Sequence, residues 1–371
     1  VFLGDNIYPA GLPAEDDPTR EEAEQRIKAE LAAIEGFKGR PFFIPGNHDW
    51  NRMSGGGREA VIRQADYIED YLDNSEVFFP ENGCGDPVAI ELSKDVTLII
   101  IDSQWWLQRW ENEPDINKGC DIKSRAELEA KLASLIDEYD DTNMILAMHH
   151  PVFTQGSHNG YFPIKEHIFP LTYLNEGLYI PLPVIGSLHP VNRFLGTARQ
   201  DVTNSMYKRL IEVVNTATYR KRNMVIASGH EHNMQYFNED DKHFIVSGSG
   251  SKKSYLKKGL DANFLHERQG FVRLNYYKDG QVWMEYWTAE NKRGDGNLVF
   301  RKQIKEKTLL GEKAPDKTFQ EIWEGKPDTV GYIAAPNYEA GKGKRFWLGR
   351  NYRDAWTGAV PLPVLDMDTM L

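Results

Sequence analysis

The sequence lacks an apolar stretch that could cross a bilayer as a helix, because no run of eighteen or more apolar residues occurs in its 371 residues. It also lacks an excess of basic residues, since its net charge is -11. That charge argues against a protein that binds a nucleic-acid backbone, which usually needs a basic face. A small anionic substrate is still compatible with it, because a bound metal ion can dominate the local field.

A start residue and a leader are also missing. The chain begins with Val1 rather than methionine, and no signal peptide precedes the apolar residues that follow. We therefore expect that the natural protein has further residues before Val1.

Cysteine is scarce. Cys84 and Cys120 are the two cysteines of the chain, and both lie in polar stretches rich in glycine, aspartate and asparagine. They fit either two free thiols or one disulfide, which would contribute about 3–4 kcal/mol in the chain-entropy description. The sequence leaves both alternatives open.

What is present is an alternation of strand-like and helical patterns, which predicts a layered α/β protein. Strands are expected at residues 41–44, 88–92, 96–101, 144–148, 224–228 and 244–246. Apolar stripes at helical spacing predict helices around Ile27 and Leu31, Val61 to Leu72, Leu128 to Tyr139 and Met206 to Ala217. Residues 16–18 are expected to cap the first helix, and Ser124 with Glu127 the third. The Asp279-Gly280 pair between alternating runs predicts a hairpin.

The composition changes near residue 301, where the chain becomes rich in lysine, glycine, proline and tryptophan without a sustained period. We expect a main domain over residues 1–300 and a C-terminal extension or linker over residues 301–371.

Four polar clusters each follow a strand-like run. They occupy residues 4–8 (Gly-Asp-Asn-Ile-Tyr), 46–49 (Gly-Asn-His-Asp), 149–151 (His-His-Pro) and 229–232 (Gly-His-Glu-His). Loops that leave the carboxyl ends of strands in an open α/β sheet converge on one crevice. Carboxylate, amide, phenol and imidazole groups gathered there would form a metal site with oxygen and nitrogen ligands.

Each cluster also has an ordinary structural interpretation. Residues 46–49 are typical of a turn, and residues 229–232 fit a loop with two solvated imidazoles. Asp5 could cap a helix, Tyr8 could be a packed ring, and His149 could be a hydrogen-bonded core histidine. The occurrence of all four clusters, each after a strand, favours the metal site.

The series of motifs resembles the calcineurin-like metallophosphoesterases. Tyr8, three residues after Asp5, and His158, nine residues after His149, make it similar to their purple acid phosphatase branch. The resemblance covers about residues 1–290. It implies a four-layer α/β/β/α sandwich, in which helices flank two mixed sheets, and a pair of metal ions about 3.5 Å apart.

The same resemblance implies a role for each matching residue. Asp5 would bridge both metals, Tyr8 and His232 would bind the first, and Asn47, His149 and His230 would bind the second. The first ion would be ferric and the second a divalent iron, zinc or manganese. His48 and His158 would act on the phosphoryl and leaving groups. Gln235 also matches the family pattern, without a chemical role.

One family element has no counterpart in the chain. The family has an earlier strand that ends in Asp-x-Gly or Asp-x-His and supplies a further ligand to the first metal. We expect this strand to precede Val1. The alternative is that the protein has lost that ligand.

The implied activity is hydrolysis of a phosphate monoester on a small substrate by direct attack of metal-bound hydroxide, with no nucleic acid as partner. One alternative is a phosphodiesterase or nuclease of the same superfamily. The other is a weakly catalytic domain of the same fold that serves envelope assembly or binding. The aromatic residues Trp50, Trp105, Trp106 and Tyr161 would either stack on a leaving group or belong to the core.

The C-terminal segment has a weaker resemblance of its own. Residues 348–353 (Leu-Gly-Arg-Asn-Tyr-Arg), Trp356 and residues 361–366 are similar to a linker of large bacterial envelope proteins. In those proteins a phosphoesterase domain precedes an outer-membrane β-barrel. This resemblance implies an exported chain, periplasmic or associated with the outer membrane, and a surface extension is the alternative.

Overall fold

The structure is a computed structural model that describes residues 1–307, apart from 174, 176, 260 and 290–295, and the backbone of residues 329–333. Its α-helices are α1 (Arg20–Ala32), α2 (Gly57–Leu72), α3 (Ser103–Leu107), α4 (Arg125–Glu138), α5 (Ile164–Ile168), α6 (Pro183–Phe194) and α7 (Ser205–Ala217). Short 3-10 turns are η1 (Asn51–Met53), η2 (Glu81–Gly83), η3 (Trp110–Asn112), η4 (Ser157–Asn159) and η5 (Pro170–Tyr173).

The strands form two sheets. The first has seven strands in the order β1-β2-β3-β4-β6-β5-β7: β1 (Val88–Ser93), β2 (Val96–Ile100), β3 (Asn143–Ala147), β4 (Val225–Ser228), β6 (Lys242–Ser247), β5 (Met234–Glu239) and β7 (Phe264–His266). The second has the order β10-β9-β8-β11: β10 (Gly296–Lys305), β9 (Val282–Ala289), β8 (Gly270–Tyr276) and β11 (Thr329–Ile333). Strands β2, β3, β4 and β6 run parallel at the centre of the first sheet.

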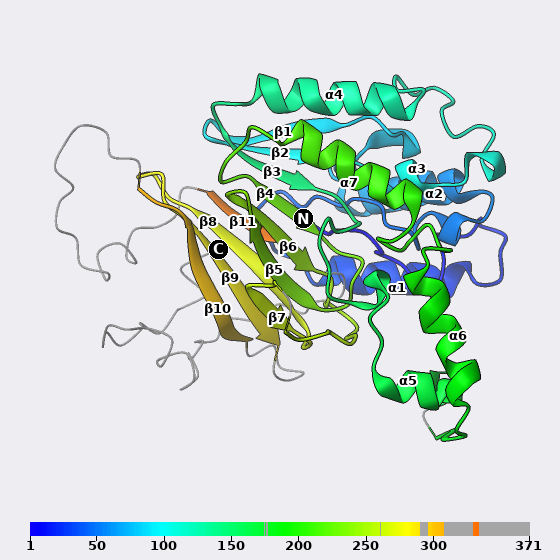
Figure 1. Cartoon of the computed structure of the whole chain (residues 1–371). Coiled ribbons are helices and arrows are strands. Elements are labelled where there is room, and N and C mark those ends of the chain that lie inside the picture. Colours follow the sequence, from blue (N-terminus) through cyan, green and yellow to red (C-terminus); the bar gives the residue numbers. More distant parts are fainter. Residues whose placement is uncertain (174, 176, 260, 290–295, 308–328, 334–371) are drawn as a thin grey trace.

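The expected α/β sandwich is confirmed. One apolar core joins α1, α2, α4 and α7 to one face of the seven-stranded sheet. A second core joins the other face of that sheet to the four-stranded sheet, through residues such as Leu98, Ile245, Leu274 and Met284. Figure 1 shows these layers side by side, with the helices on one side and the smaller sheet on the other. The described residues thus form three of the four expected layers.

Near the N-terminus the backbone is less regular than expected. Instead of a strand over residues 41–44, Phe43 makes isolated parallel bridges to Phe2 and Phe78. The three side chains are buried, and the rings of Phe2 and Phe43 stack 4.3 Å apart. Backbone hydrogen bonds from Phe2 to Phe42 at 2.7 Å and from Ile44 to Phe2 at 3.1 Å, together with this side-chain packing, hold the segments in extended conformation.

The strand and hairpin predictions for the rest of the sheet match the structure closely. Strands β1 to β4 and β6 overlap the expected runs, and β8 and β9 pair antiparallel around Asp279-Gly280. Gly280 has a φ of 84°, a conformation that glycine adopts without a steric cost.

The first helix begins later than expected. It starts at Arg20, because the Asp17 carboxylate accepts hydrogen bonds from both the amide and the hydroxyl of Thr19 and so forms a turn before the helix. In α4 the Ser124 hydroxyl accepts from the Glu127 amide, as predicted. The Glu127 carboxylate accepts from the amide of Lys123, one residue before the expected partner.

Cys84 and Cys120 form a disulfide with their Cα atoms 5.5 Å apart, so the bridged alternative is the one found. None of the described helices has the combined length and apolarity that a membrane-spanning helix needs.

The expected boundary near residue 301 falls inside β10. The backbone of residues 329–333 adds β11 to the edge of the second sheet beside β8. The residues that resemble an envelope linker, 348–353, 356 and 361–366, lie outside the described residues.

Candidate metal centre

The four polar clusters meet at one edge of the seven-stranded sheet. His149 follows β3 and His230 follows β4, and these two strands run parallel, so their carboxyl ends lie together. The amide of Gly229 donates to the carbonyl of His149, which joins the two loops directly. Asp5 and Asn47 arrive from the extended segments around Phe2 and Phe43.

Three donor atoms from three loops form a nearly equilateral triangle. Asn47 Oδ1 lies 3.0 Å from His149 Nε2, His149 Nε2 lies 3.1 Å from His230 Nδ1, and His230 Nδ1 lies 3.0 Å from Asn47 Oδ1. All three residues are buried. Donor atoms bound side by side to an octahedral ion at about 2.1 Å are themselves about 3.0 Å apart. The triangle therefore fits one face of a metal coordination sphere.

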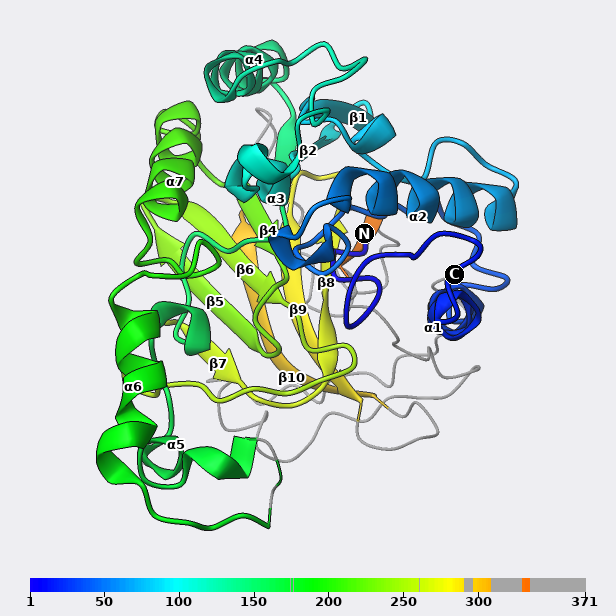
Figure 2. The same ribbon diagram turned by 90° about the vertical axis from the view of Figure 1, so that its right-hand side faces the viewer.

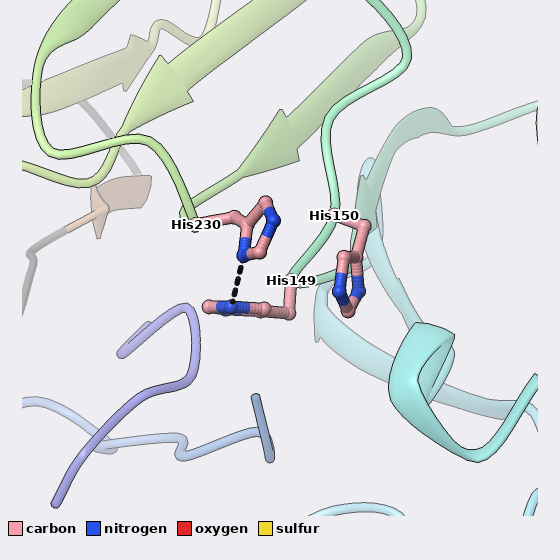
Figure 3. Close-up of side chains that lie close together, drawn as sticks. All are labelled: His149, His150 and His230. Carbon is pink, nitrogen blue, oxygen red and sulfur yellow. Dashed lines mark hydrogen bonds between the residues drawn. The ribbon is translucent and has the colours of Figure 1, made fainter. Parts of the chain in front are cut away.

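Hydrogen bonds on the far side of each ring orient the two histidines. His149 Nδ1 lies 2.7 Å from the carbonyl of Leu3, and His230 Nε2 lies 3.2 Å from the carbonyl of Gln200. A carbonyl only accepts, so these nitrogens hold ring protons. Burial holds the pKa of His230 well below its ordinary value, so its opposite nitrogen keeps a lone pair. Burial also acts to lower the pKa of His149, but the Asp5 charge outweighs it and raises that pKa, so His149 would give up a proton on binding a metal. Figure 3 shows His149 Nε2 and His230 Nδ1 facing each other, joined by the dashed line.

His150 is also buried but takes no part in this triangle. Its Nδ1 lies 2.8 Å from Ser103 Oγ and its Nε2 lies 2.7 Å from Gln200 Oε1. Both ring nitrogens thus have partners that fix the ring against α3 and the segment after α6. The His150 ring nevertheless lies beside the other two, with its centre 4.4 Å from that of His230 (Figure 3).

A second group of donors forms around Tyr8. The Tyr8 hydroxyl lies 3.0 Å from Asp5 Oδ2 and 3.0 Å from His232 Nε2. The other oxygen of Asp5, Oδ1, lies 3.4 Å from His149 Nε2. Asp5 thus directs one oxygen to each group, which is the arrangement that a bridging carboxylate needs.

The backbone is strained where these ligands are presented. Asp5 has a φ of 58° and His230 a φ of 63°, in the left-handed region that side-chain-bearing residues rarely adopt. A Cβ atom on Gly46 would lie 2.4 Å from the Asp5 amide and 2.5 Å from its Oδ1, so only glycine fits there. Such strain gathers at functional sites, where the surrounding structure holds it in place.

The charge states of the donors suit a cation. Burial lowers the pKa of His232 to about 4 and holds the pKa of His230 well below its ordinary value, so both imidazoles are neutral and able to bind metal. Burial opposes ionisation of Asp5, but the neighbouring imidazoles of His149 and His48 outweigh it and hold the pKa of the carboxyl below its usual range. Burial and the Asp5 charge raise the pKa of Tyr8, so it is a neutral phenol that must lose its proton to bind a metal.

The two histidines expected to act on the substrate lie at the edge of this cluster. The His48 ring is 4.2 Å from the Tyr8 ring, and its amide donates to Asp5 Oδ1 at 2.9 Å. The His158 ring stacks on the His230 ring at 3.7 Å. Both are partly exposed.

Gln235 holds the loop that carries His158. It is fully buried, its Oε1 accepts from the Gln155 amide at 2.7 Å, and its Nε2 donates to Thr154 Oγ1 at 3.1 Å. Gln235, which matches the family pattern three residues after His232, therefore has a structural role in fixing the segment before His158.

Sequence analysis missed three residues that support the site. Asp201 is fully buried and its Oδ1 lies 3.2 Å from His158 Nδ1. Gln200 supplies the carbonyl next to His230, and Glu231 Oε1 accepts from the His158 amide at 2.9 Å. Glu231 had a detectable signal, because a carboxylate lies between two ligand histidines. Gln200 and Asp201 had none, because they follow the α5–α6 excursion, which extends away from both sheets in Figure 2.

Of the four aromatic residues that would either stack on a leaving group or belong to the core, three belong to the core. Trp50, Trp105 and Trp106 are buried in the core. The indole of Trp50 donates to Asp102 Oδ2 at 2.7 Å. Tyr161 remains partly exposed, three residues after His158.

No protein-family model matches the chain, and no curated protein matches its sequence. Among solved structures, the chain is similar to GAP50, the anchor in the inner membrane complex of Plasmodium, with a TM-score of 0.48 and 16% identity over 82% of this chain and 78% of that one. It is also similar to PhoD, with a TM-score of 0.44 and 12% identity over 83% of this chain and 66% of that one. The chain thus spans just under two thirds of the PhoD structure.

Proposed function

We propose that this chain is a metal-dependent phosphoric ester hydrolase and that it acts on small phosphate monoesters. The observation that supports this best is the triangle of Asn47 Oδ1, His149 Nε2 and His230 Nδ1, with edges of 3.0–3.1 Å. With both imidazoles neutral, two ring nitrogens and an amide oxygen would bring three lone pairs this close together, and these would repel one another. A cation among them would relieve that repulsion.

Two metal ions fit the donor set. Asn47, His149 and His230 would hold one, Tyr8 and His232 would hold the other, and Asp5 would contribute an oxygen to each. The phenol and carboxylate favour ferric iron in the second group, with iron, zinc or manganese among the nitrogens. When bound, such ions lower the pKa of coordinated water and neutralise charge on a phosphoryl group.

The remaining residues of the site would bind and orient the ester. His48 lies beside Tyr8, and His158 lies beside His230. An imidazole there is placed to donate a hydrogen bond to a phosphoryl oxygen and a proton to the departing alkoxide. The Glu231 carboxylate, which accepts from the His158 amide, would hold His158 in that orientation together with Asp201. Asp201 is itself paired with Arg193 at 2.5 Å, and Arg193 also contacts the His158 ring.

The proposal extends to the compartment. A disulfide between Cys84 and Cys120 is typical of an oxidising environment. It supports an exported protein, for which we propose the periplasm or an association with the outer membrane.

The test is hydrolysis of p-nitrophenyl phosphate by the purified protein, before and after exhaustive chelation and after return of iron, zinc or manganese. We expect turnover that chelation abolishes and metal restores. Bis-p-nitrophenyl phosphate, tested in parallel, would identify a phosphodiesterase if it is the faster substrate. Metal binding without turnover on either ester would instead support the binding-domain alternative.

A further inference from the structure

A positively charged loop lies beside the metal centre of this acidic protein. Residues 248–259 contain four lysines (252, 253, 257 and 258) and no aspartate or glutamate, whereas the whole chain has a net charge of -11. A local excess of one charge against the net charge of the protein attracts ligands of opposite charge to that place.

The loop is held against both sides of the site by its backbone. The amide of Ser254 donates to the carbonyl of His232 at 2.8 Å, and the amide of Lys257 donates to the carbonyl of Gln155 at 2.9 Å. Between these two contacts Leu256 is buried, with an exposed fraction of 2%. The loop therefore connects the segment that carries His232 to the segment that carries His158.

Two of the lysines are placed by aromatic rings, one in the N-terminal segment that carries Asp5 and one in the segment that carries His158. Lys252 Nζ lies 3.6 Å from the centre of the Tyr8 ring, and Lys257 Nζ lies 4.4 Å from the centre of the Tyr161 ring. Contacts of this kind hold an ammonium group over a ring while leaving its protons available to another partner. One cation is thus fixed beside the Tyr8 group of donors and another beside the His158 loop.

A third cation lies close to Lys252. The Arg26 guanidinium donates to the carbonyl of Tyr8 and also pairs with Glu22 at 2.6 Å. Arg26, Glu22 and Tyr8 line a pocket of about 410 Å³ between the Tyr8 segment and α1. No residue of the lysine loop lines this pocket, but Tyr8 does, and its ring is the one that Lys252 contacts.

We propose that Lys252 and Lys257 form an anion-binding site beside the metal centre, which binds a second negatively charged group of the substrate. The inference rests on the proposed function, because it names the substrate class of the same site. The substrate class is a phosphate monoester that also carries a second phosphate or an equivalent anion, rather than a monoester whose only anion is the reacting phosphate. The second anion contributes binding through the two ammonium groups while the reacting phosphate occupies the centre.

The experiment compares fructose 6-phosphate with fructose 1,6-bisphosphate, which differ by one phosphate group. The kcat/KM ratio of bisphosphate to monophosphate is measured for the wild type, Lys252→Ala, Lys257→Ala and the double variant. We expect a ratio well above one in the wild type, and a fall of about tenfold or more in the double variant, as for lost hydrogen bonds to a charged group. Higher ionic strength should lower the ratio as well.

Lys253→Ala is the matched control, because it removes the same charge from the same exposed loop. In the part of the chain that the structure describes, Lys253 stacks on neither tyrosine ring. Its ratio should stay within about twofold of the wild type, as for an exposed surface charge. If Lys253→Ala lowers the kcat/KM ratio as much as the double variant does, the loop attracts anions by its overall charge, and the proposed site at Lys252 and Lys257 is wrong.

Calorimetric binding of inorganic pyrophosphate to the metal-free protein separates this inference from the proposed function. If the protein hydrolyses no ester but binds pyrophosphate in a way that depends on Lys252 and Lys257, the anion site is supported and the proposed hydrolase activity is wrong. Rapid monoester hydrolysis with no preference for the bisphosphate, and pyrophosphate binding unchanged in the double variant, would leave the hydrolase and overturn the anion site.

Discussion

Asn47 Oδ1 lies 3.0 Å from His149 Nε2, although 102 residues separate the two in the chain. The contact exists because Asn47 ends the extended segment around Phe43 while His149 ends β3, and both segments reach the same edge of the molecule. His230 then completes the set from β4.

Removing one member of the triangle should remove metal. His230→Ala is expected to lose close to one equivalent of bound metal, and Asn47→Ala to bind it about 10–100-fold more weakly, since its amide oxygen is a single neutral ligand. Plasma mass spectrometry of the dialysed proteins measures both. His167→Ala is the control, because this imidazole lies on α5 and contacts Ser187 outside the site. Full metal content in His230→Ala would contradict the assignment.

The Tyr8 hydroxyl predicts a colour. A phenolate bound to ferric iron absorbs visible light by charge transfer, so the iron-loaded protein should be coloured. Tyr8→Phe should lose the band while the far-ultraviolet circular dichroism stays unchanged, because only the hydroxyl that contacts Asp5 and His232 is removed. A colourless iron-loaded wild type, or a coloured Tyr8→Phe, would show that Tyr8 is not a ligand.

His158 should affect turnover without affecting metal content. General acid catalysis is worth about 10²–10⁴ in rate, so His158→Ala should lose turnover in that range on alkyl phosphates and less on p-nitrophenyl phosphate, whose leaving group needs little protonation. Asp201→Asn should show the same dependence on the leaving group in weaker form, because Asp201 acts through His158. An equal loss on every ester, or a loss of metal, would assign His158 another role.

The disulfide should matter for stability. Because Cys84 and Cys120 are 36 residues apart in sequence, replacing both with serine should lower the free energy of unfolding by about 3–4 kcal/mol. Urea denaturation of the oxidised wild type and the double variant measures the difference. Reduction of the wild type by dithiothreitol should produce a similar change, and equal midpoints for all three would contradict this prediction.

Glu69 should make stability depend on pH. Partial burial, together with Asp66, Glu81 and Asp70, raises the pKa of Glu69 to about 7 from an ordinary value of 4.5. Because the folded state holds this proton more tightly than the unfolded state, stability should fall as the pH rises from about 4.5 through 7. Glu69→Gln should reduce that fall. The melting temperature of the variant minus that of the wild type should therefore be larger at pH 8 than at pH 4. A constant difference between the two proteins would disprove the shift.

Local patterns predicted much of this molecule. The central parallel strands were visible as short continuous apolar runs, because they are buried on both faces. The hairpin was visible from alternating residues around Asp279-Gly280. The extended segment over residues 41–44 differs from its prediction, because Phe43 pairs with Phe2 and Phe78 through isolated bridges rather than as part of a longer strand.

The support around the ligands was largely invisible in the sequence. Gln200 and Asp201 reach His230 and His158 only because the α5–α6 excursion returns to the site, and nothing local marks that return. The role of Lys252 likewise depends on the loop contacts with His232 and Gln155, which link distant segments. Tertiary contacts of this kind have no period that a sequence pattern could reveal.

The most direct test compares two adjacent histidines. His149 and His150 are both fully buried, but only His149 directs a free nitrogen at Asn47 and His230, while both nitrogens of His150 are bound by Ser103 and Gln200. Metal content of His149→Ala and His150→Ala, measured on protein whose circular dichroism matches the wild type, decides between them. The account predicts that His149→Ala loses metal and His150→Ala retains it. Equal retention in both variants, or loss in His150→Ala alone, would contradict the proposed metal centre.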